Sequence, residues 1–148
     1  MATPYKVVFD AADPHAQARF WAEALGYVVE DHSRLIKSLL DQGAVPDADV
    51  VDVDGVQAFR TAAAIRDPEA PVDEFSGTGR GGRVLFQTVP ESKTAKNRVH
   101  LDLHVGDERD AVVDRLVGLG ATVIGEGSEG PSTWKVLADP EGNEFCVA

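Results

Sequence analysis

The stretch LGYVV at residues 25–29 recurs, with substitutions, as LGATV at residues 119–123. In both places Leu-Gly ends a stretch with helical spacing, and a short apolar stretch with β-branched residues follows it, which is typical of a helix that leads into a strand. An aspartate precedes each helix at the same spacing of 94 residues, and IRDP at 65–68 matches LADP at 137–140. The alternative is chance recurrence of short peptides. Because the matches come in one order, they predict one supersecondary unit that is present twice.

Each half of the chain is expected to form a strand, a helix and three further strands. In the first half, YKVVFD at residues 5–10 predicts a strand because it is rich in Val and Phe. Residues 13–26 predict a helix, with Asp13 as its N-cap and Gly26 at its end.

In the second half, RVHLDLHV at residues 98–105 alternates apolar and polar side chains, which is typical of a strand with one apolar face. Residues 107–120 predict the helix of this half. The sequence DPEGN, which begins at Asp139, predicts a turn before the closing strand.

The first half is longer than the second. The spacing between matching stretches falls from 94 residues to 72, so the first half contains a net insertion of 22 residues. We assign it to about residues 32–55, with a helix over 32–43, where Ser33 is the expected cap, and an acidic loop over 44–55. The glycine-rich stretch GTGRGG at 77–82 predicts a turn or a mobile lid, because it lacks the GK[ST] of a phosphate-binding loop.

The composition excludes some classes of partner. The chain has 148 residues, a net charge of −11 and a pI of about 4.6. This charge argues against nucleic acid or an anionic membrane as the main partner. No apolar stretch approaches the ~20 residues that span a membrane. Because Cys146 is the only cysteine and no secretory signal is evident, we expect a cytoplasmic protein.

Three motifs carry a resemblance to a known family, namely FWAEALGY at 20–27, KNRVHLDL at 96–103 and DPEGNEFCV at 139–147. With them the chain resembles the vicinal oxygen chelate superfamily, which includes glyoxalase I, bleomycin-resistance proteins and extradiol dioxygenases. Within that superfamily it is most similar to the glyoxalase-like domain proteins. The resemblance covers nearly the whole chain.

The resemblance implies an α+β fold in which two βαβββ units form a cup that holds a small molecule. It further implies one domain over residues 1–148, with a first unit over about 4–89 that contains the insertion and a second over about 97–148. The two units would pair within one chain or across a homodimer.

The resemblance also implies four positions for metal ligands. The first-strand position lies seven residues before the aspartate of each helix, and it holds Lys6 in the first half and His100 in the second. The last-strand positions hold Gln87 and Cys146, the latter in place of a glutamate. His100 is therefore the only intact family ligand, since a lysine ammonium is a poor ligand and a hard ion prefers His and carboxylate. We expect no cofactor, with a divalent metal ion left open.

Further candidate residues lie on the same strand as His100 and on the two strands that close the chain. Asp102 shares the polar face of its strand with His100 and is either a functional carboxylate or one paired with Arg98 or Lys6. Trp134 is a candidate wall of the cup, and Glu144 a candidate assisting carboxylate. We therefore expect His100 to be the catalytic residue of this site. The expected binding residues are Lys6, Gln87, Asp102, Trp134, Glu144 and Cys146.

Three functions remain as hypotheses. The preferred one is a small-molecule-binding protein of the glyoxalase and bleomycin-resistance type with a degenerate metal site. The second is a lyase or isomerase that uses His100 as a base or metal ligand. The third is a partner-binding domain that uses the apolar residues of the inserted helix, which are Leu35, Ile36, Leu39 and Leu40. Whether the protein is an enzyme is left open.

Overall fold

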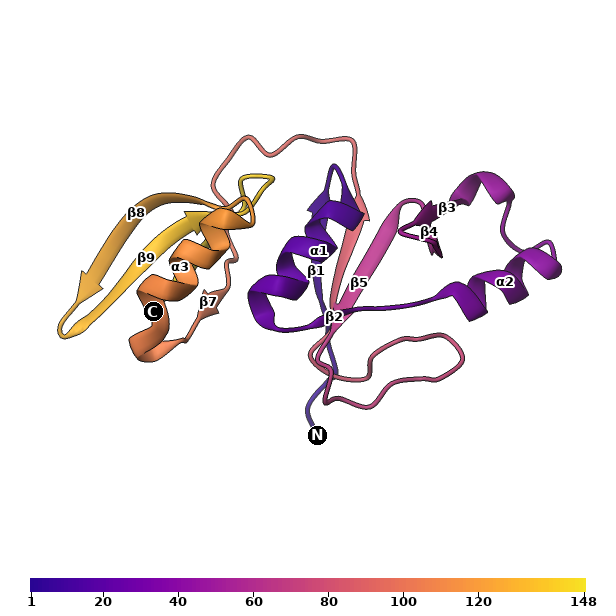
Figure 1. Cartoon of the computed structure of the whole chain (residues 1–148), viewed down its shortest axis with the longest axis horizontal. Coiled ribbons are helices and arrows are strands. Elements are labelled where there is room, and N and C mark those ends of the chain that lie inside the picture. The colour runs from indigo at the N-terminus through magenta and orange to yellow at the C-terminus, as the bar shows by residue number, and fades with distance from the viewer. The chain divides into compact units, whose positions relative to one another are not determined.

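The chain folds into two units, residues Met1–Pro90 and Glu91–Ala148. The structure is a computed structural model that describes all residues from 1 to 148 (Figure 1). Unit 1 contains, in chain order, β1 (Val7–Ala11), α1 (Pro14–Leu25), β2 (Val28–Val29), α2 (Ser33–Asp41), the 3-10 helix η1 (Asp47–Asp49), β3 (Val50–Val53), β4 (Val56–Phe59), β5 (Ala62–Arg66) and β6 (Val84–Thr88). Unit 2 contains β7 (Asp102–Leu103), the 3-10 helix η2 (Gly106–Glu108), α3 (Arg109–Gly118), β8 (Thr122–Glu129), β9 (Ser132–Ala138) and β10 (Glu144–Val147).

The two units have the same topology, so the predicted α+β fold with a repeated βαβββ unit is confirmed. Unit 1 has a four-stranded sheet in the order β1-β6-β5-β2, and unit 2 has one in the order β7-β10-β9-β8. In each sheet the first strand pairs in parallel with the last, and the other neighbours are antiparallel. Between β2 and β5, unit 1 contains α2, η1 and the hairpin β3–β4, for which unit 2 has no counterpart. The domain boundaries themselves stay a prediction.

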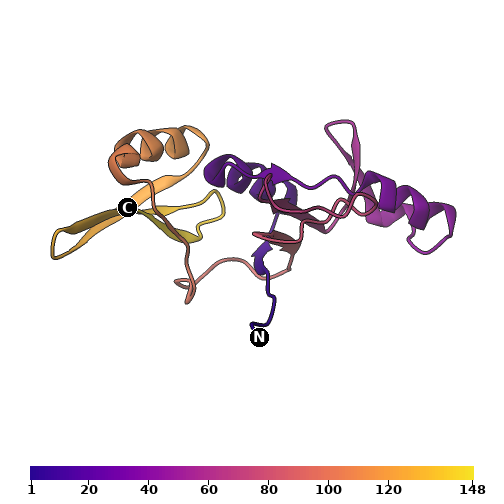
Figure 2. The same cartoon turned by 90° about the horizontal axis from the view of Figure 1, so that it is seen from below.

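Helix α1 follows the predicted capping signals. The Asp13 side chain accepts hydrogen bonds from the backbone N–H groups of His15 and Ala16, and Gly26 ends the helix in the left-handed conformation. The ring of Trp21 on this helix packs edge-on against Phe9 of β1 at 5.3 Å between centroids. The helix therefore covers one face of the unit 1 sheet (Figure 2). Even α1, at 12 residues, is far too short to cross a membrane, and no other helix qualifies either.

The acidic loop expected over residues 44–55 is wrong in part. Its second half forms β3, which pairs with β4 in an antiparallel hairpin. The turn consists of Asp54 and Gly55, which both have positive φ, and an Asp-Gly pair of this kind favours a tight hairpin. The expected cap of α2 is also wrong, because the N-cap is His32, and the side chain of Asp31 accepts a hydrogen bond from the Ser33 N–H.

The strand expected over residues 98–105 is shorter than its alternation suggests. Only Asp102 and Leu103 form a ladder with β10, although the carbonyl of Leu101 also accepts a hydrogen bond from Cys146 N–H. The unit 2 helix likewise begins later than predicted, since residues 106–108 form a 3-10 turn before α3. Alternation predicted the faces correctly within β7, where Leu103 is buried and Asp102 is exposed, but not at Val99, which alternation places on the apolar face and which is 78% exposed.

The core of unit 2 lies on the face of the sheet that α3 covers. Its large buried residues come from alternate strand positions and from the helix, and they are Leu103, Val113, Leu116, Leu137, Phe145 and Val147. The register places Asp102 beside Cys146, and Cys146 beside Val136, on the opposite face. We call this the open face of unit 2, and the face of the unit 1 sheet away from α1 the open face of unit 1.

Candidate functional site

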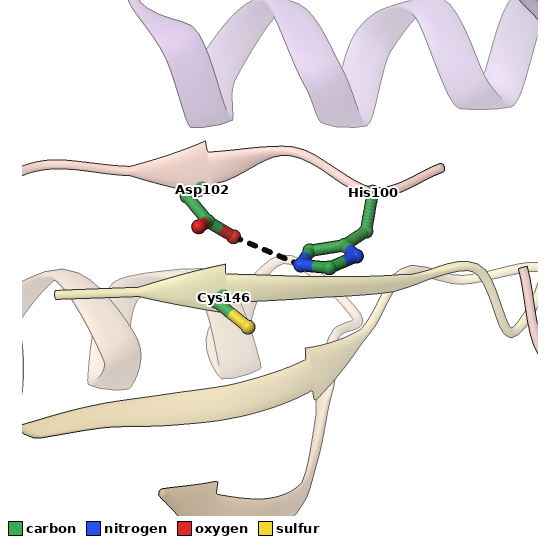
Figure 3. A group of neighbouring side chains, drawn as sticks. All are labelled: His100, Asp102 and Cys146. Atoms are coloured by element: carbon green, nitrogen blue, oxygen red, sulfur yellow. Dashed lines mark ion pairs between the residues drawn. The ribbon is translucent and has the colours of Figure 1, made fainter. Parts of the chain in front are cut away.

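The open face of unit 2 brings together three side chains with metal-binding or proton-transfer chemistry. They are His100, Asp102 and Cys146, and their ligand atoms all lie within 4.8 Å of one another (Figure 3). Nε2 of His100 lies 3.2 Å from Oδ1 of Asp102. Asp102 and Cys146 are neighbours because β7 and β10 run in parallel with these two residues in register. His100 precedes β7 by two residues and so projects on the same side.

The chemistry of this cluster follows from the contacts among its three side chains. With Nε2 of His100 directed at Asp102, the carboxylate orients the ring, and Nδ1 is the nitrogen left to accept a proton. Burial raises the pKa of the Cys146 thiol, and the neighbouring charge of Asp102 raises it further. The thiol therefore remains protonated at neutral pH, which does not favour a role as nucleophile. Asp102 pairs with His100 and not with Arg98 or Lys6.

The cluster fits some metal ions better than others. One imidazole, one carboxylate and one thiolate match the three protein ligands of an open zinc site. They do not match the His and carboxylate set that a hard octahedral ion prefers. The other two positions implied by the resemblance, Lys6 and Gln87, belong to unit 1, and an ammonium group donates hydrogen bonds but cannot ligate. The residues therefore fit zinc at unit 2 alone, through His100, Asp102 and Cys146.

Glu144 lies on the open face, and its carboxylate is hydrogen-bonded to the segment that precedes β7. Its carboxylate accepts hydrogen bonds from the backbone N–H of Asn97 at 3.0 Å and from Nζ of Lys93 at 3.1 Å. The hydrogen bond from Asn97 is the main reason why the pKa of Glu144 falls to about 2, with Lys93 adding to it. Glu144 therefore orders residues 93–97, and its role in binding stays a prediction.

Trp134 lies over the neighbouring strand β8. It pairs with Gly127 across the β8–β9 ladder, and a Cβ at Gly127 would lie 2.4 Å from the indole ring. The indole therefore occupies the space that a side chain at position 127 would fill. This places Trp134 on the same open face as Cys146, since Trp134 and Val136 are two residues apart on β9.

A substitution of Gly127 tests this placement. We expect Gly127→Ala to displace the indole of Trp134 and to shift its fluorescence emission, because a Cβ at 2.4 Å cannot coexist with the ring. The matched control is Gly125→Ala on the same strand, where the nearest neighbour is a Val136 carbon at 4.0 Å. Fluorescence of the two variants, compared in a Trp21→Phe background, gives the answer. Identical spectra would show that Trp134 does not pack over Gly127.

The open face of unit 1 carries the other two predicted residues, but in different surroundings. Nε2 of Gln87 donates to Oδ1 of Asp10 at 3.3 Å, so this amide is already engaged. Lys6 is exposed and makes no ion pair or hydrogen bond. It lines a pocket of about 230 Å³ that the structure forms entirely within unit 1. The lining residues are Lys6, His32, Leu35, Phe59, Ala62, Ala63, Thr78, Arg83 and Leu85.

A buried ion cluster beside this pocket was not expected from the sequence. The carboxylate of Glu30 is fully buried and receives hydrogen bonds from the Gly79 N–H at 2.7 Å and from Nε of Arg83 at 2.9 Å. Nη2 of Arg83 lies 2.9 Å, and Nε2 of His32 3.1 Å, from its other oxygen. The only signal for this cluster in the sequence is that an acidic residue, Glu30, directly follows YVV and a basic residue, Arg83, directly precedes VLFQTV. Nothing in the sequence indicated that these two residues pair.

A family model described as "Glyoxalase-like domain" matches residues 6–148. No curated protein matches the chain.

Among solved structures, a glyoxalase/bleomycin resistance protein/dioxygenase family enzyme from Burkholderia phytofirmans is 17% identical, with a TM-score of 0.56 over 96% of this chain and 94% of that one. A bleomycin-binding protein from Streptomyces verticillus, solved with copper(II)-bleomycin, is 15% identical, with a TM-score of 0.53 over 100% and 96% of the two chains. A fosfomycin resistance protein from Listeria monocytogenes, solved with Mn(II) and a dihydroxypropylphosphonic acid, is 9% identical, with a TM-score of 0.58 over 99% and 89%. At these identities the likeness is one of fold.

Proposed function

The chain belongs to the glyoxalase-like domain family, within the vicinal oxygen chelate superfamily, and we propose that it binds a small organic molecule without an obligatory metal ion. The observation that carries this proposal is Lys6. It stands where the family resemblance implies a metal ligand, and its unpaired ammonium lines a pocket of about 230 Å³. A fixed cation at this position favours an anionic group and disfavours a metal cation. Solved proteins with this fold include one that holds bleomycin, which supports a binding role.

A second function is favoured by the cluster in unit 2. Because Asp102 orients His100 and leaves its Nδ1 without a partner, His100 is suited to accept a proton from a bound substrate. This arrangement supports a lyase or isomerase in which His100 is the base. If zinc is bound, His100, Asp102 and Cys146 would hold it, and the ion would polarise an oxygen of the substrate.

Metal content separates the two functions. We expect protein purified without an affinity tag to contain well below one equivalent of transition metal per chain, and the His100→Ala variant to contain no less than the wild type. The reason is that a bound ion would have to displace the proton of the Cys146 thiol, whose pKa is raised by burial and by Asp102. Elemental analysis after incubation with Zn, Mn, Fe or Ni and removal of free ions provides the measurement.

The matched control for this experiment is His104→Ala. His104 lies four residues beyond His100, and is exposed, but it is not part of the cluster. The proposal would be wrong if wild type and His104→Ala each contained about one zinc per chain and His100→Ala contained none. That result would favour the metal-dependent enzyme instead.

The third hypothesis assigned partner binding to the apolar residues of the inserted helix. In the structure Ile36 of this helix is fully buried, and Leu35 lines the pocket of unit 1. Leu39 and Leu40 are partly buried. The apolar side of α2 therefore packs on its own unit to a large extent. Partner binding, a homodimer and a cytoplasmic location stay predictions.

A further inference from the structure

Two cationic side chains of the unit 1 pocket lie at the same end of two neighbouring strands. Lys6 immediately precedes β1 and Arg83 immediately precedes β6. Because these strands run in parallel with Val7 opposite Val84, the two cations enter the open face at the same end. This juxtaposition depends on strand register and not on loop conformation.

The third charged residue of the lining is His32, and its hydrogen bonds define its protonation state. Nδ1 lies 2.5 Å from the backbone carbonyl of Ser76, and Nε2 lies 3.1 Å from Glu30. Both partners are acceptors, so these contacts favour the ring with both nitrogens protonated, and they raise the pKa of His32 above its usual 6.5 in spite of burial. It adds positive charge to the pocket but has no hydrogen bond left for a ligand.

The lining contains no carboxylate. Two carboxylates adjoin the lining. Glu30 has a fully buried side chain that is already bonded to Arg83, His32 and the Gly79 N–H, and Asp31, next to His32 in the chain, accepts a hydrogen bond from the Ser33 N–H and interacts with the charge of His32. The cationic groups of Lys6, Arg83 and His32 line the pocket, whereas neither carboxylate does. In a protein of net charge −11 this local excess of positive charge concentrates anions at one place.

Three groups in the lining have donors that no protein acceptor uses. They are Nζ of Lys6, Nη1 of Arg83 and the hydroxyl of Thr78. The lining also contains the apolar side chains of Leu35 from α2, Phe59 from β4 and Leu85 from β6. A ligand that matches both kinds of group has a hydrogen-bond-accepting anion and an apolar body.

The volume limits the size of that body. An apolar cavity of about 150 Å³ holds one benzene molecule, so about 230 Å³ leaves room for a ring and one further group of a few atoms. We propose that this pocket binds a small carboxylate that carries an apolar group of about the size of a phenyl ring, with the carboxylate at Lys6 and Arg83. This inference rests on the proposed function, and it names the ligand class and the place where the ligand binds.

The test uses two probes of equal shape, phenylacetate and the neutral phenylacetamide. Titration of the full chain, followed by ¹H–¹⁵N NMR spectra, gives both the affinity and the location of binding. We expect phenylacetate to bind at least tenfold more tightly than phenylacetamide, with shifts at Leu35, Phe59 and Leu85. Lys6→Met should weaken phenylacetate binding by about ten- to a hundredfold, because a charge-assisted hydrogen bond is lost, and should leave phenylacetamide nearly unaffected.

The matched control is Lys37→Met. Lys37 lies on α2 with a largely exposed side chain that pairs with Asp41, and it does not line the pocket. Loss of this lysine changes the net charge equally and should leave affinity for phenylacetate within a factor of two. Arg83 is a poorer choice for mutation, since its loss would leave Glu30 buried without its main partner.

Other outcomes would overturn the inference in distinguishable ways. Equal binding of the two probes, or equal effects of Lys6→Met and Lys37→Met, would exclude the anionic class but leave small-molecule binding intact. Shifts confined to residues near His100 and Cys146 would move the ligand to unit 2. If neither probe shifts any resonance up to millimolar concentrations, the inference is wrong. If a wider set of neutral and cationic fragments also produces no shift, the proposed function fails with it.

Discussion

Replacing Glu30 by glutamine is expected to lower the free energy of unfolding by roughly 3 kcal/mol. The side chain is fully buried and its two oxygens accept hydrogen bonds from Arg83, His32 and the Gly79 N–H. The amide of glutamine keeps the size of the side chain but removes its charge, so the guanidinium of Arg83 remains largely buried without a counter-ion. Because a domain of this size has only about 5–15 kcal/mol of stability, the change is large. Chemical denaturation of the two proteins measures it.

The pH dependence of the difference identifies its cause. Burial alone would raise the pKa of Glu30, but the hydrogen bonds from His32 and Arg83 outweigh burial and lower the pKa from 4.5 to about 2. The contribution of Glu30 is therefore complete above pH 4.5 and is lost as the pH falls through about 2. For His32, burial opposes the charged ring, but its hydrogen bonds to Glu30 and Ser76 raise the pKa above 6.5. Its contribution is complete below pH 6.5 and is lost as the pH rises through the raised pKa.

The stability difference between wild type and Glu30→Gln is thus expected to be largest between about pH 4.5 and 6.5. The matched control is Glu69→Gln, a substitution of an exposed glutamate in the same unit, which should change stability by less than about 0.5 kcal/mol. A Glu30→Gln variant as stable as Glu69→Gln would show that the ion cluster contributes nothing. A difference that does not depend on pH would show that the charges of Glu30 and His32 are not its cause.

Local signals in the sequence predicted the features that depend on a few neighbouring residues. Asp13 and Gly26 predicted both ends of α1, because capping needs only the residues at a helix end. Alternation around Asp102 predicted which side chains share a face, although not where the strand begins. The recurrence of LGYVV predicted the repeated unit, since two copies of a unit repeat its local pattern.

Features that depend on contacts between distant residues were not predictable in this way. Glu30 and Arg83 are 53 residues apart, and no local pattern indicates that they meet. The cluster of unit 2 was predictable only in part. The family resemblance implies that Cys146 lies near His100, whereas the spacing of the two residues in the sequence does not. The pocket of unit 1 depends on Leu35 of α2 and Phe59 of β4, two elements that the repeated unit lacks.

The turn at residues 73–77 shows how a distant contact requires a glycine at Gly77, for which the sequence predicted only a turn or a mobile lid. Gly77 has a φ of +74°, and a Cβ built there would lie 2.0 Å from the backbone carbonyl oxygen of Asp31. The turn is fixed by hydrogen bonds, from Gly77 N–H to the Asp73 carbonyl at 2.7 Å and from the His32 ring to the Ser76 carbonyl. This turn spans residues 73–77 and so lies mostly before GTGRGG at 77–82, for which a turn or a mobile lid stays a prediction.

Gly77→Ala is therefore expected to lower the free energy of unfolding by about 3 kcal/mol, from left-handed backbone strain and from the loss of the His32–Ser76 hydrogen bond as the turn moves away from Asp31. The matched control is Gly43→Ala, since Gly43 has a similar φ of +67° but no atom within 4 Å of its added Cβ. That variant should lose only about 1 kcal/mol, from the strain alone. Because Thr78 follows Gly77 and lines the pocket, Gly77→Ala should also weaken phenylacetate binding, whereas Gly43→Ala should not. Equal stability losses in denaturant for the two variants would mean that the turn is free to shift and does not hold the pocket in shape.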